Sequence, residues 1–172
     1  VRTHGSGNAG STNMLRTYGK LPAAATLICD MLKGALSVWF GMLIFADIGA
    51  SIAGLFVVLG HMFPCFYKFK GGKGFASYLG MTSALHWKFA IAVLLLVVVV
   101  TLITDYIVAA TTTTIVIVPI GIGLLTQSLL IPLILLVASA VIAWKHKDNY
   151  VRMYNGTEIR FRKAGRGDYR VK

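Results

Sequence analysis

Long apolar runs constrain this chain more than any other feature of its sequence. Residues 91–100 contain no polar side chain, and similar runs recur between residues 23 and 144. About 20 apolar residues in a helix cross the hydrocarbon of a bilayer, whereas the strands of a membrane barrel alternate apolar and polar residues. These runs do not alternate. We therefore predict an all-α integral membrane protein, a multi-span helical bundle that forms a single domain over residues 1–172.

Positive charge is concentrated in three polar stretches. The net charge is +11, and 15 of the 17 Lys and Arg residues lie in residues 1–20, 61–74 and 145–172, which hold three, three and nine of them. Basic loops stay on the cytoplasmic side during insertion, so we predict that all three stretches are cytosolic. The basic tail can also contact anionic lipid headgroups. Because topology accounts for the charge, we predict the lipid bilayer as a partner and no nucleic acid.

The cytosolic stretches limit the number of crossings between them. We predict one helix near 23–43 and another near 44–60, with an outer turn at Asp47. The chain between the second and third basic stretches must cross an even number of times. Four short spans fit, near 75–87, 89–104, 106–125 and 128–144, with outer turns at Lys88 and Gln127 and an inner turn at Asp105. About six spans result, although two long crossings and a re-entrant segment satisfy the same parity.

A few polar residues fall inside the apolar segments. Asp30 and Lys33 are three residues apart on one helix face, so we predict that they form a structural pair inside the bundle. The hydroxyls of residues 111–114 are expected to bond back to their own helix. Cys29 and Cys65 show no metal-type spacing. We predict no metal site and no cofactor.

The segment from His4 to Arg16 is rich in glycine, amides and hydroxyls. Its glycines spell GxGxxG, but no strand precedes them, so we reject a dinucleotide site. Glycines still let the backbone approach an anion, to which N–H groups and hydroxyls donate, and Arg16 adds a planar fork suited to phosphate. We predict a phosphate site with contacts from Gly7, Asn8 and Asn13, rather than a flexible polar loop.

A second glycine-rich and basic segment precedes the helix predicted near residue 75. It is not a P-loop, because an upstream Gly and a Ser or Thr after Lys73 are missing. Its last four residues nevertheless open a helix, where free N–H groups and the helix dipole favour an anion. The alternative is a basic loop placed by topology alone. We predict phosphate contacts from Gly71, Gly72, Lys73 and Gly74.

The third polar cluster begins at Lys145. If it starts as a helix, His146 and Asn149 stand one turn apart on one face. A histidine beside an amide donor can take a proton or hold a developing oxyanion. Taken alone, this segment is more typical of a basic flank that stops membrane insertion.

The three clusters together resemble the motifs of the bacterial acyl-phosphate:glycerol-3-phosphate acyltransferase family, often called PlsY. Their order and spacing agree with the family across essentially the whole chain. The resemblance is carried by residues 5–16 and 60–74, by Asp30-Met31-Leu32-Lys33-Gly34, and by the spacing His146…Asn149…Gly156-Thr157-Glu158.

The resemblance implies an enzyme of phospholipid biosynthesis in the bacterial plasma (inner) membrane. Such an enzyme transfers a fatty acyl group from a long-chain acyl phosphate to the 1-hydroxyl of glycerol 3-phosphate, giving lysophosphatidic acid and phosphate. It implies catalytic roles for Ser6, Arg16, His146 and Asn149, and a structural role for Glu158.

The inner turn departs from the family pattern. Relatives commonly carry a basic residue where this chain has Asp105, followed by serines, one of which Thr111 replaces as a phosphate contact. The family also has seven spans, the first of them ahead of the first motif. We therefore expect that the given sequence lacks an N-terminal helix.

An acyl phosphate is already activated, so we predict direct attack by the glycerol hydroxyl. Asn149 or Ser6 would stabilise charge on the carbonyl, and the proton would go to His146 or to a substrate phosphate.

The sequence leaves two alternative functions. A transporter of an organic phosphate often shows repeated halves, and another phosphate-ester lipid transferase would need clustered aspartates for Mg²⁺. Acyl-chain preference and oligomeric state stay open, and a monomer is compatible with the sequence.

Overall fold

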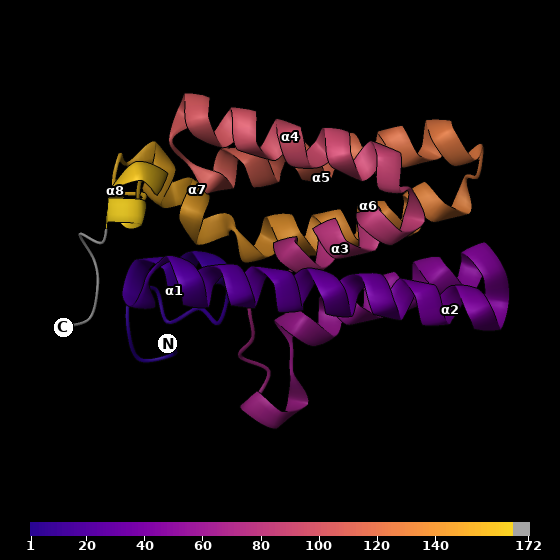
Figure 1. The fold of residues 1–172 in the computed structure, drawn as a ribbon, viewed down its shortest axis with the longest axis horizontal. Coiled ribbons are helices and arrows are strands. Elements are labelled where there is room, and N and C mark those ends of the chain that lie inside the picture. The colour runs from indigo at the N-terminus through magenta and orange to yellow at the C-terminus, as the bar shows by residue number, and fades with distance from the viewer. Residues whose placement is uncertain (167–172) are drawn as a thin grey trace.

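The computed structural model describes residues 1–166, and helices make up most of that part of the chain (Figure 1). No strand occurs within the described residues, which confirms the predicted all-α fold. The last six residues of the predicted cytosolic stretch 145–172 lie outside them. The helices are α1 (Ser11–Tyr18), α2 (Lys20–Met62), α3 (Phe75–Leu85), α4 (Trp87–Thr104), α5 (Ile107–Thr126), α6 (Leu130–Lys145), α7 (Lys147–Tyr154) and α8 (Phe161–Arg166), with a 3-10 turn at Cys65–Tyr67.

α2 folds back on itself and forms two antiparallel arms (Figure 1). Phe45 and Ala46 have non-helical backbone angles, and Ala46 has a positive φ of 45°. Beside this break, Gly41 and Gly49 pack so closely that a Cβ added to either would overlap the carbonyl of the other. The break confirms the two predicted helices, with the turn one to two residues before Asp47.

The two arms of α2 differ in length. Residues 20–44 span about 37 Å at the rise of an α-helix, whereas residues 47–62 span about 24 Å. The second arm therefore ends well inside the length of the first. Figure 1 accordingly shows the loop between α2 and α3 leaving the side of the bundle and not its end. This geometry places the glycine-rich loop between α2 and α3 next to the middle of the bundle rather than at its end.

Small residues bring α2 and α3 into backbone contact. A Cβ on Gly34 would overlap the carbonyl of Ser77, and one on Gly80 would overlap the carbonyl of Met31. Such close approach at small residues is typical of helix pairs in membranes. α3 thus lies against the first arm of α2, and the end of the glycine-rich loop, which leads into α3, is held there with it.

Two of the three turns predicted between residues 75 and 144 are confirmed. Asp105 ends α4 and Gln127 ends α5, each in the left-handed conformation. The predicted turn at Lys88 is wrong by two residues, because Lys88 lies in the first turn of α4. The turn is at His86, whose Nδ1 accepts a hydrogen bond from the Phe89 N–H at 3.1 Å and caps α4. Hydropathy does not reveal such a cap.

The polar patch in α5 bonds as predicted. The hydroxyl of each of the residues 111–114 donates to the carbonyl four positions earlier, at 3.1, 2.9, 3.0 and 2.8 Å in chain order. A helix can therefore carry four consecutive threonines among apolar neighbours without leaving their donors unsatisfied.

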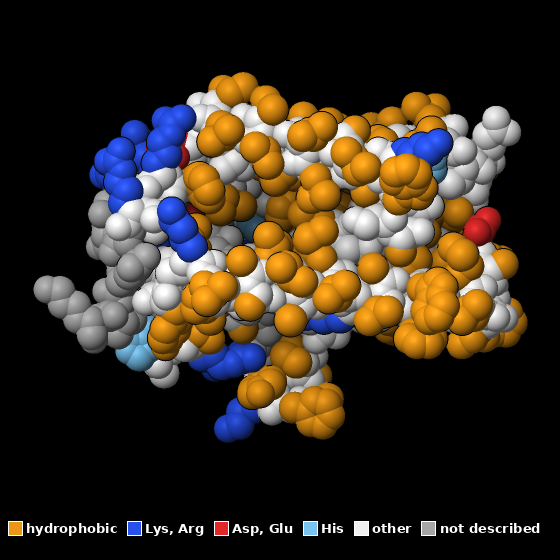
Figure 2. Space-filling view, in the orientation of Figure 1, with side chains coloured by type: hydrophobic (Ala, Val, Ile, Leu, Met, Phe, Trp, Pro, Cys, Tyr) orange, Lys and Arg blue, Asp and Glu red, His pale blue; other side chains and the backbone are white. Residues whose placement is uncertain are grey.

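The outer surface is that of an integral membrane protein. Apolar side chains cover the face of the bundle that Figure 2 shows, and basic side chains on that face gather mainly at the end that carries α7 and α8. Three segments of the described chain are long and apolar enough to cross a membrane: Lys20–Tyr67, α4 and α5. A fourth is present if α6 and α7, bent by 52°, form one span. The count of about six spans stays a prediction.

Candidate active site

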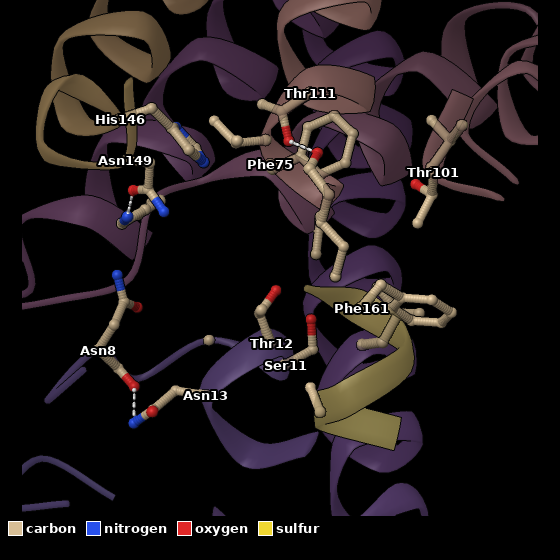
Figure 3. Close-up of a pocket in the computed structure, with 18 of the residues that line it drawn as sticks. Asn8, Ser11, Thr12, Asn13, Phe75, Thr101, Thr111, His146, Asn149 and Phe161 are labelled. Atoms are coloured by element: carbon tan, nitrogen blue, oxygen red, sulfur yellow. Dashed lines mark hydrogen bonds between the residues drawn. The ribbon is translucent and has the colours of Figure 1, made fainter. Parts of the chain in front are cut away.

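A cavity of about 410 Å³ lies where the three polar clusters meet. Figure 2 shows the surface hollowed between α4 and the first arm of α2. Its polar lining comprises Ser6, Asn8, Ser11, Thr12, Asn13, Arg16, Asp30, His61, Lys73, Thr101, Thr111, His146, Asn149, Arg152 and Glu158. Its apolar lining includes Leu94, Val97, Val98 and Leu102 along one face of α4. In Figure 3, Asn8 and Asn149 lie on one side of the open space, and Thr101 and Phe161 on the other.

A second cavity of about 240 Å³ adjoins the first. The two share four lining residues, Ser6, Asn8, Lys73 and Arg152. The second cavity is completed by Gly7, Gly71, Gly72, Lys145 and Asp148. Three basic side chains and one acid thus face it, which suits an anion. The site is therefore a pair of compartments, one amphipathic and one basic, that meet at Lys73.

Asn13 organises the first glycine-rich loop. Its side chain is 2% exposed. Its Oδ1 accepts from the Ser6 N–H at 2.9 Å, and its Nδ2 lies 3.0 Å from the carbonyls of Val1, His4 and Asn8. These bonds hold the loop curled over the start of α1. Because they occupy the amide, we expect Asn13 to shape the loop rather than to bind phosphate itself.

The N-terminus of α1 faces the cavity. The helix starts at Ser11 after Gly10, and no side chain caps it. Figure 3 shows Ser11 and Thr12 with their hydroxyls toward the open space. The half-buried Asn8 adds an amide beside them, whose Nδ2 group is the part that can donate to an anion. Free N–H groups and hydroxyls at a helix start form a natural anion site.

The glycine-rich loop before α3 rests directly on His61. The N–H groups of Gly71 and Gly72 donate to the carbonyls of Met62 and His61, both at 3.1 Å. A Cβ added to Gly72 would overlap Nε2 of the His61 ring. No side chain larger than a hydrogen fits there. The absence of a side chain at Gly72 is thus a packing requirement of the loop.

The predicted pair in α2 supports that histidine. Asp30 and Lys33 form the ion pair that their spacing predicts. The Nδ1 atom of His61 lies 3.3 Å from the carboxylate of Asp30 and 2.6 Å from the ammonium of Lys33. These contacts join the first arm of α2 to the end of the second. The pair therefore braces the loop that carries Lys73.

Lys73 stands between the two compartments and is half-buried. Its ammonium donates to Oδ1 of Asn149. Burial lowers the pKa of Lys73 from its usual 10.5 to about 8, and the nearby charges of Arg152 and Arg16 act in the same direction. A charged group that is partly desolvated binds an anion more strongly than it does in water. Lys73 is thus the central cation of the site.

Glu158 holds the other polar side chains in place. Its carboxylate accepts from Asn149 Nδ2 at 2.8 Å and from Arg152 Nε at 2.7 Å, and its side chain is 7% exposed. Asn149 therefore bonds on both sides, to Glu158 and to Lys73. This chain of contacts supports the structural role expected of Glu158, and it makes Asn149 the group that positions the Lys73 ammonium.

His146 lies just beyond α6, at the bend into α7, and lines the larger cavity. Its Nδ1 lies 2.8 Å from the Ile142 carbonyl, so Nδ1 carries the hydrogen and Nε2 is the acceptor. Burial lowers the pKa of His146 to about 4. The imidazole is neutral near neutral pH. Asn149 follows one turn later, its N–H donating to the His146 carbonyl at 2.8 Å, as the spacing predicts.

The structure brings the predicted site residues to one place. Apart from Gly7, those of the first and third clusters line the larger cavity together with Asp30, Lys73, Gly74 and Thr111. Gly7, Gly71 and Gly72 line the smaller cavity, and Lys33 lines neither. Their chemical roles stay predictions. Sequence reasoning did not select Ser11, Thr12 or Arg152. The hydroxyls sit within the first cluster, and their place at a helix start is a signal that could have identified them.

The rate of the acyl transfer that the resemblance implies is expected to fall at alkaline pH as Lys73 loses its proton. With its pKa lowered to about 8, the charged form is present below that pH and is lost as the pH rises through it. We expect kcat/KM, which reports groups of the free enzyme, to fall above about pH 8. Lys73→Arg should move that fall to higher pH. A profile that stays flat up to roughly pH 10 would contradict the assignment.

Comparisons with known proteins give a consistent picture. A family model described as glycerol-3-phosphate acyltransferase matches residues 1–156. A glycerol-3-phosphate acyltransferase of Bartonella henselae is 42% identical over 92% of this chain and 77% of its own length. One of Paraburkholderia xenovorans is 37% identical over 99% of this chain and 82% of its own length.

Solved structures agree with the sequence relatives. The crystal structure of PlsY, an integral membrane glycerol 3-phosphate acyltransferase, in its glycerol 3-phosphate form matches with a TM-score of 0.88 and 31% identity, over 93% of this chain and 81% of that chain. Its lysophosphatidic acid form matches with a TM-score of 0.85 and 30% identity, over 90% of this chain and 80% of that chain.

Proposed function

The chain belongs to the glycerol-3-phosphate acyltransferase family, and we propose that its two joined cavities hold glycerol 3-phosphate beside a long-chain acyl phosphate. The protein is an enzyme that acylates glycerol 3-phosphate to lysophosphatidic acid. Acyl transfer is favoured over the organic-phosphate transporter and over the other lipid transferase that the sequence left open.

The observation that supports an acyl phosphate as the donor is the amphipathic lining of the larger cavity. One side presents Lys73, Arg16 and the start of α1, and the other presents the apolar face of α4. An acyl phosphate needs both, a cationic place for its phosphate and an apolar place for its chain. The adjoining basic cavity offers a separate place for the phosphate of glycerol 3-phosphate, with Lys73 between the two.

We propose direct transfer without a covalent enzyme intermediate. The 1-hydroxyl oxygen of glycerol 3-phosphate attacks the acyl carbonyl, the bond from carbonyl carbon to phosphate oxygen breaks, and inorganic phosphate leaves with that electron pair. Lys73 and Ser6, which line both cavities, are proposed to donate to the developing negative charge. Asn149 is less suited to that part, because its amide is already bonded to Glu158 and Lys73.

The proton of the attacking hydroxyl is proposed to go to the departing phosphate. The neutral imidazole of His146, with its pKa near 4, is a weaker base than a phosphate oxygen, whose second pKa is about 6. His146 then acts as a fixed acceptor that orients the hydroxyl. Under this mechanism His146→Ala lowers the rate but leaves the shape of the pH–rate profile unchanged. An acid limb that disappears in the variant would instead make His146 the base.

We further propose that residues 1–172 form one membrane-embedded acyltransferase domain in a bacterial inner membrane. Its three basic stretches would lie on the cytosolic side, where glycerol 3-phosphate is present. The gathering of basic side chains at one end of the molecule supports this orientation (Figure 2). The lateral hollow between α4 and α2 would admit the acyl phosphate from the bilayer.

The donor is tested by product formation. The purified protein in detergent is supplied with glycerol 3-phosphate and either palmitoyl phosphate or palmitoyl-CoA, and lysophosphatidic acid is measured over time. We expect product from palmitoyl phosphate alone. Equal rates from palmitoyl-CoA would overturn the donor proposal, because the site would then not depend on a phosphate beside the carbonyl. No product from either donor would overturn the acyl-transfer function itself.

A further inference from the structure

The segment Ile159–Arg166, which includes α8, closes one wall of the larger cavity. It lies beyond residue 156, where the match to the family model ends. Ile159, Phe161 and Ala164 line the cavity, and Ala164 is only 4% exposed. The basic residues of the segment are exposed on its other side, namely Arg160, Arg162, Lys163 and Arg166. A short segment with one apolar and one basic face is therefore docked with its apolar face inward.

Asp105 anchors this segment to the end of α4. Its carboxylate accepts from the Arg162 N–H at 2.9 Å, and its carbonyl accepts from the Phe161 N–H at 2.8 Å. Both N–H groups belong to the first turn of α8, where backbone N–H groups have no acceptor inside their own helix. The guanidinium of Arg162 donates in turn to the Leu102 carbonyl at 2.8 Å, one of the unpaired carbonyls at the end of α4.

α8 also reaches across the cavity. It contacts α1, while Asp105 ties it to α4. Figure 3 shows Phe161 between Thr101 of α4 and Ser11 of α1, across the open space from Asn8 and Asn149. The ring thus lies beside Thr101 of α4, across the cavity from Asn149, to which Lys73 is bonded. Its place is suited to an acyl chain that leaves the carbonyl for the bilayer.

We propose that Phe161 is a binding residue for the acyl chain of the donor, and that Asp105 is the residue that positions it by holding α8 across the cavity. This inference rests on the proposed function and names residues for the lipid half of the substrate pair. It also gives a role to Asp105, the position at which the chain departs from the family pattern at the inner turn. An acidic side chain there caps α8, which a basic side chain cannot do.

Kinetics with the purified full chain separate this role from a general structural one. We expect Phe161→Ala and Asp105→Ala to raise KM for palmitoyl phosphate about five- to tenfold, the loss expected from part of the burial of one aromatic ring. KM for glycerol 3-phosphate should stay within about twofold of wild type, because its compartment does not include α8. Asp105→Asn keeps an acceptor oxygen and should retain most of the affinity. Tyr154→Ala, at an exposed ring outside both cavities, is the matched control.

A binding measurement covers the case in which catalysis fails. Lysophosphatidic acid added to the detergent-purified protein should raise the melting temperature of wild type more than that of Phe161→Ala, whereas glycerol 3-phosphate should raise both equally. Equal lipid-induced shifts, or equal rises of both KM values, would overturn the inference. A wild type that lysophosphatidic acid stabilises more than Phe161→Ala, but that forms no product, would contradict the proposed function. It would still support Phe161 as a binding residue for the acyl chain.

Discussion

Replacing Lys73 by methionine is expected to lower kcat/KM for lysophosphatidic acid formation about 100- to 1,000-fold. Methionine keeps an unbranched stem but removes the ammonium that faces both compartments and is bonded to Asn149. Arg152, which also lines both compartments, is left in place. Two phosphates must come close together there, and one charge-stabilising donor in a partly desolvated site is worth a factor of this size. Initial rates with both substrates varied would measure the loss.

Lys70→Met is the control for this substitution. Lys70 belongs to the same loop and carries the same charge, but it is exposed and lines neither cavity. Its loss should change the rate less than about twofold. If both variants lose activity to the same extent, the effect belongs to the overall charge of the loop, and the central place of Lys73 is wrong.

Gly72→Ala is expected to abolish at least about 99% of the activity, an effect comparable to the loss of one positioned charge-stabilising donor. The added methyl would overlap the His61 ring, which contacts with Asp30 and Lys33 keep from turning aside. The loop must then move, and Lys73 moves with it. Misplacement of about 1 Å in a catalytic group can cost two orders of magnitude. Rates and the melting temperature would be measured together, and the expected loss is in rate.

Two further variants test the clash itself. Gly60→Ala places the same methyl where no atom lies within 4 Å, so it should behave as wild type. The double variant Gly72→Ala with His61→Ala removes the ring that the methyl meets, and it should be more active than Gly72→Ala alone. A double variant as inactive as the single one would show that the backbone conformation, rather than His61, requires glycine.

Helix boundaries could be predicted from the sequence because the hydrocarbon core of the bilayer limits where an apolar helix can end. An apolar run must end where the chain leaves the bilayer, and a polar residue such as Asp105 or Gln127 marks that point. Both residues end helices in the structure. The pairing of Asp30 with Lys33 was accessible for a similar reason, since an unpaired charge inside a membrane bundle is costly.

Other features depend on contacts between distant segments, which one sequence does not reveal. The unequal arms of α2 bring the glycine-rich loop to the side of the bundle. Asp47 predicts the turn between the arms, but not the non-helical backbone angles of Phe45 and Ala46 or the close packing of Gly41 on Gly49. The sequence predicts that the amide of Asn13 contacts a phosphate, whereas in the structure this amide is bonded to the backbone of its own loop. The docking of α8 depends on a hydrogen bond that the Arg162 N–H donates to the carboxylate of Asp105, 57 residues away.

Direct transfer between two bound substrates is the central claim, and an isotope-exchange measurement tests it. Wild-type protein would be incubated with palmitoyl phosphate and radiolabelled inorganic phosphate, with and without glycerol 3-phosphate. We predict that no label enters palmitoyl phosphate when glycerol 3-phosphate is absent, and that lysophosphatidic acid forms as soon as it is added. Label that enters palmitoyl phosphate without glycerol 3-phosphate would mean that an acyl-enzyme forms first, and would contradict direct attack in the joined cavities.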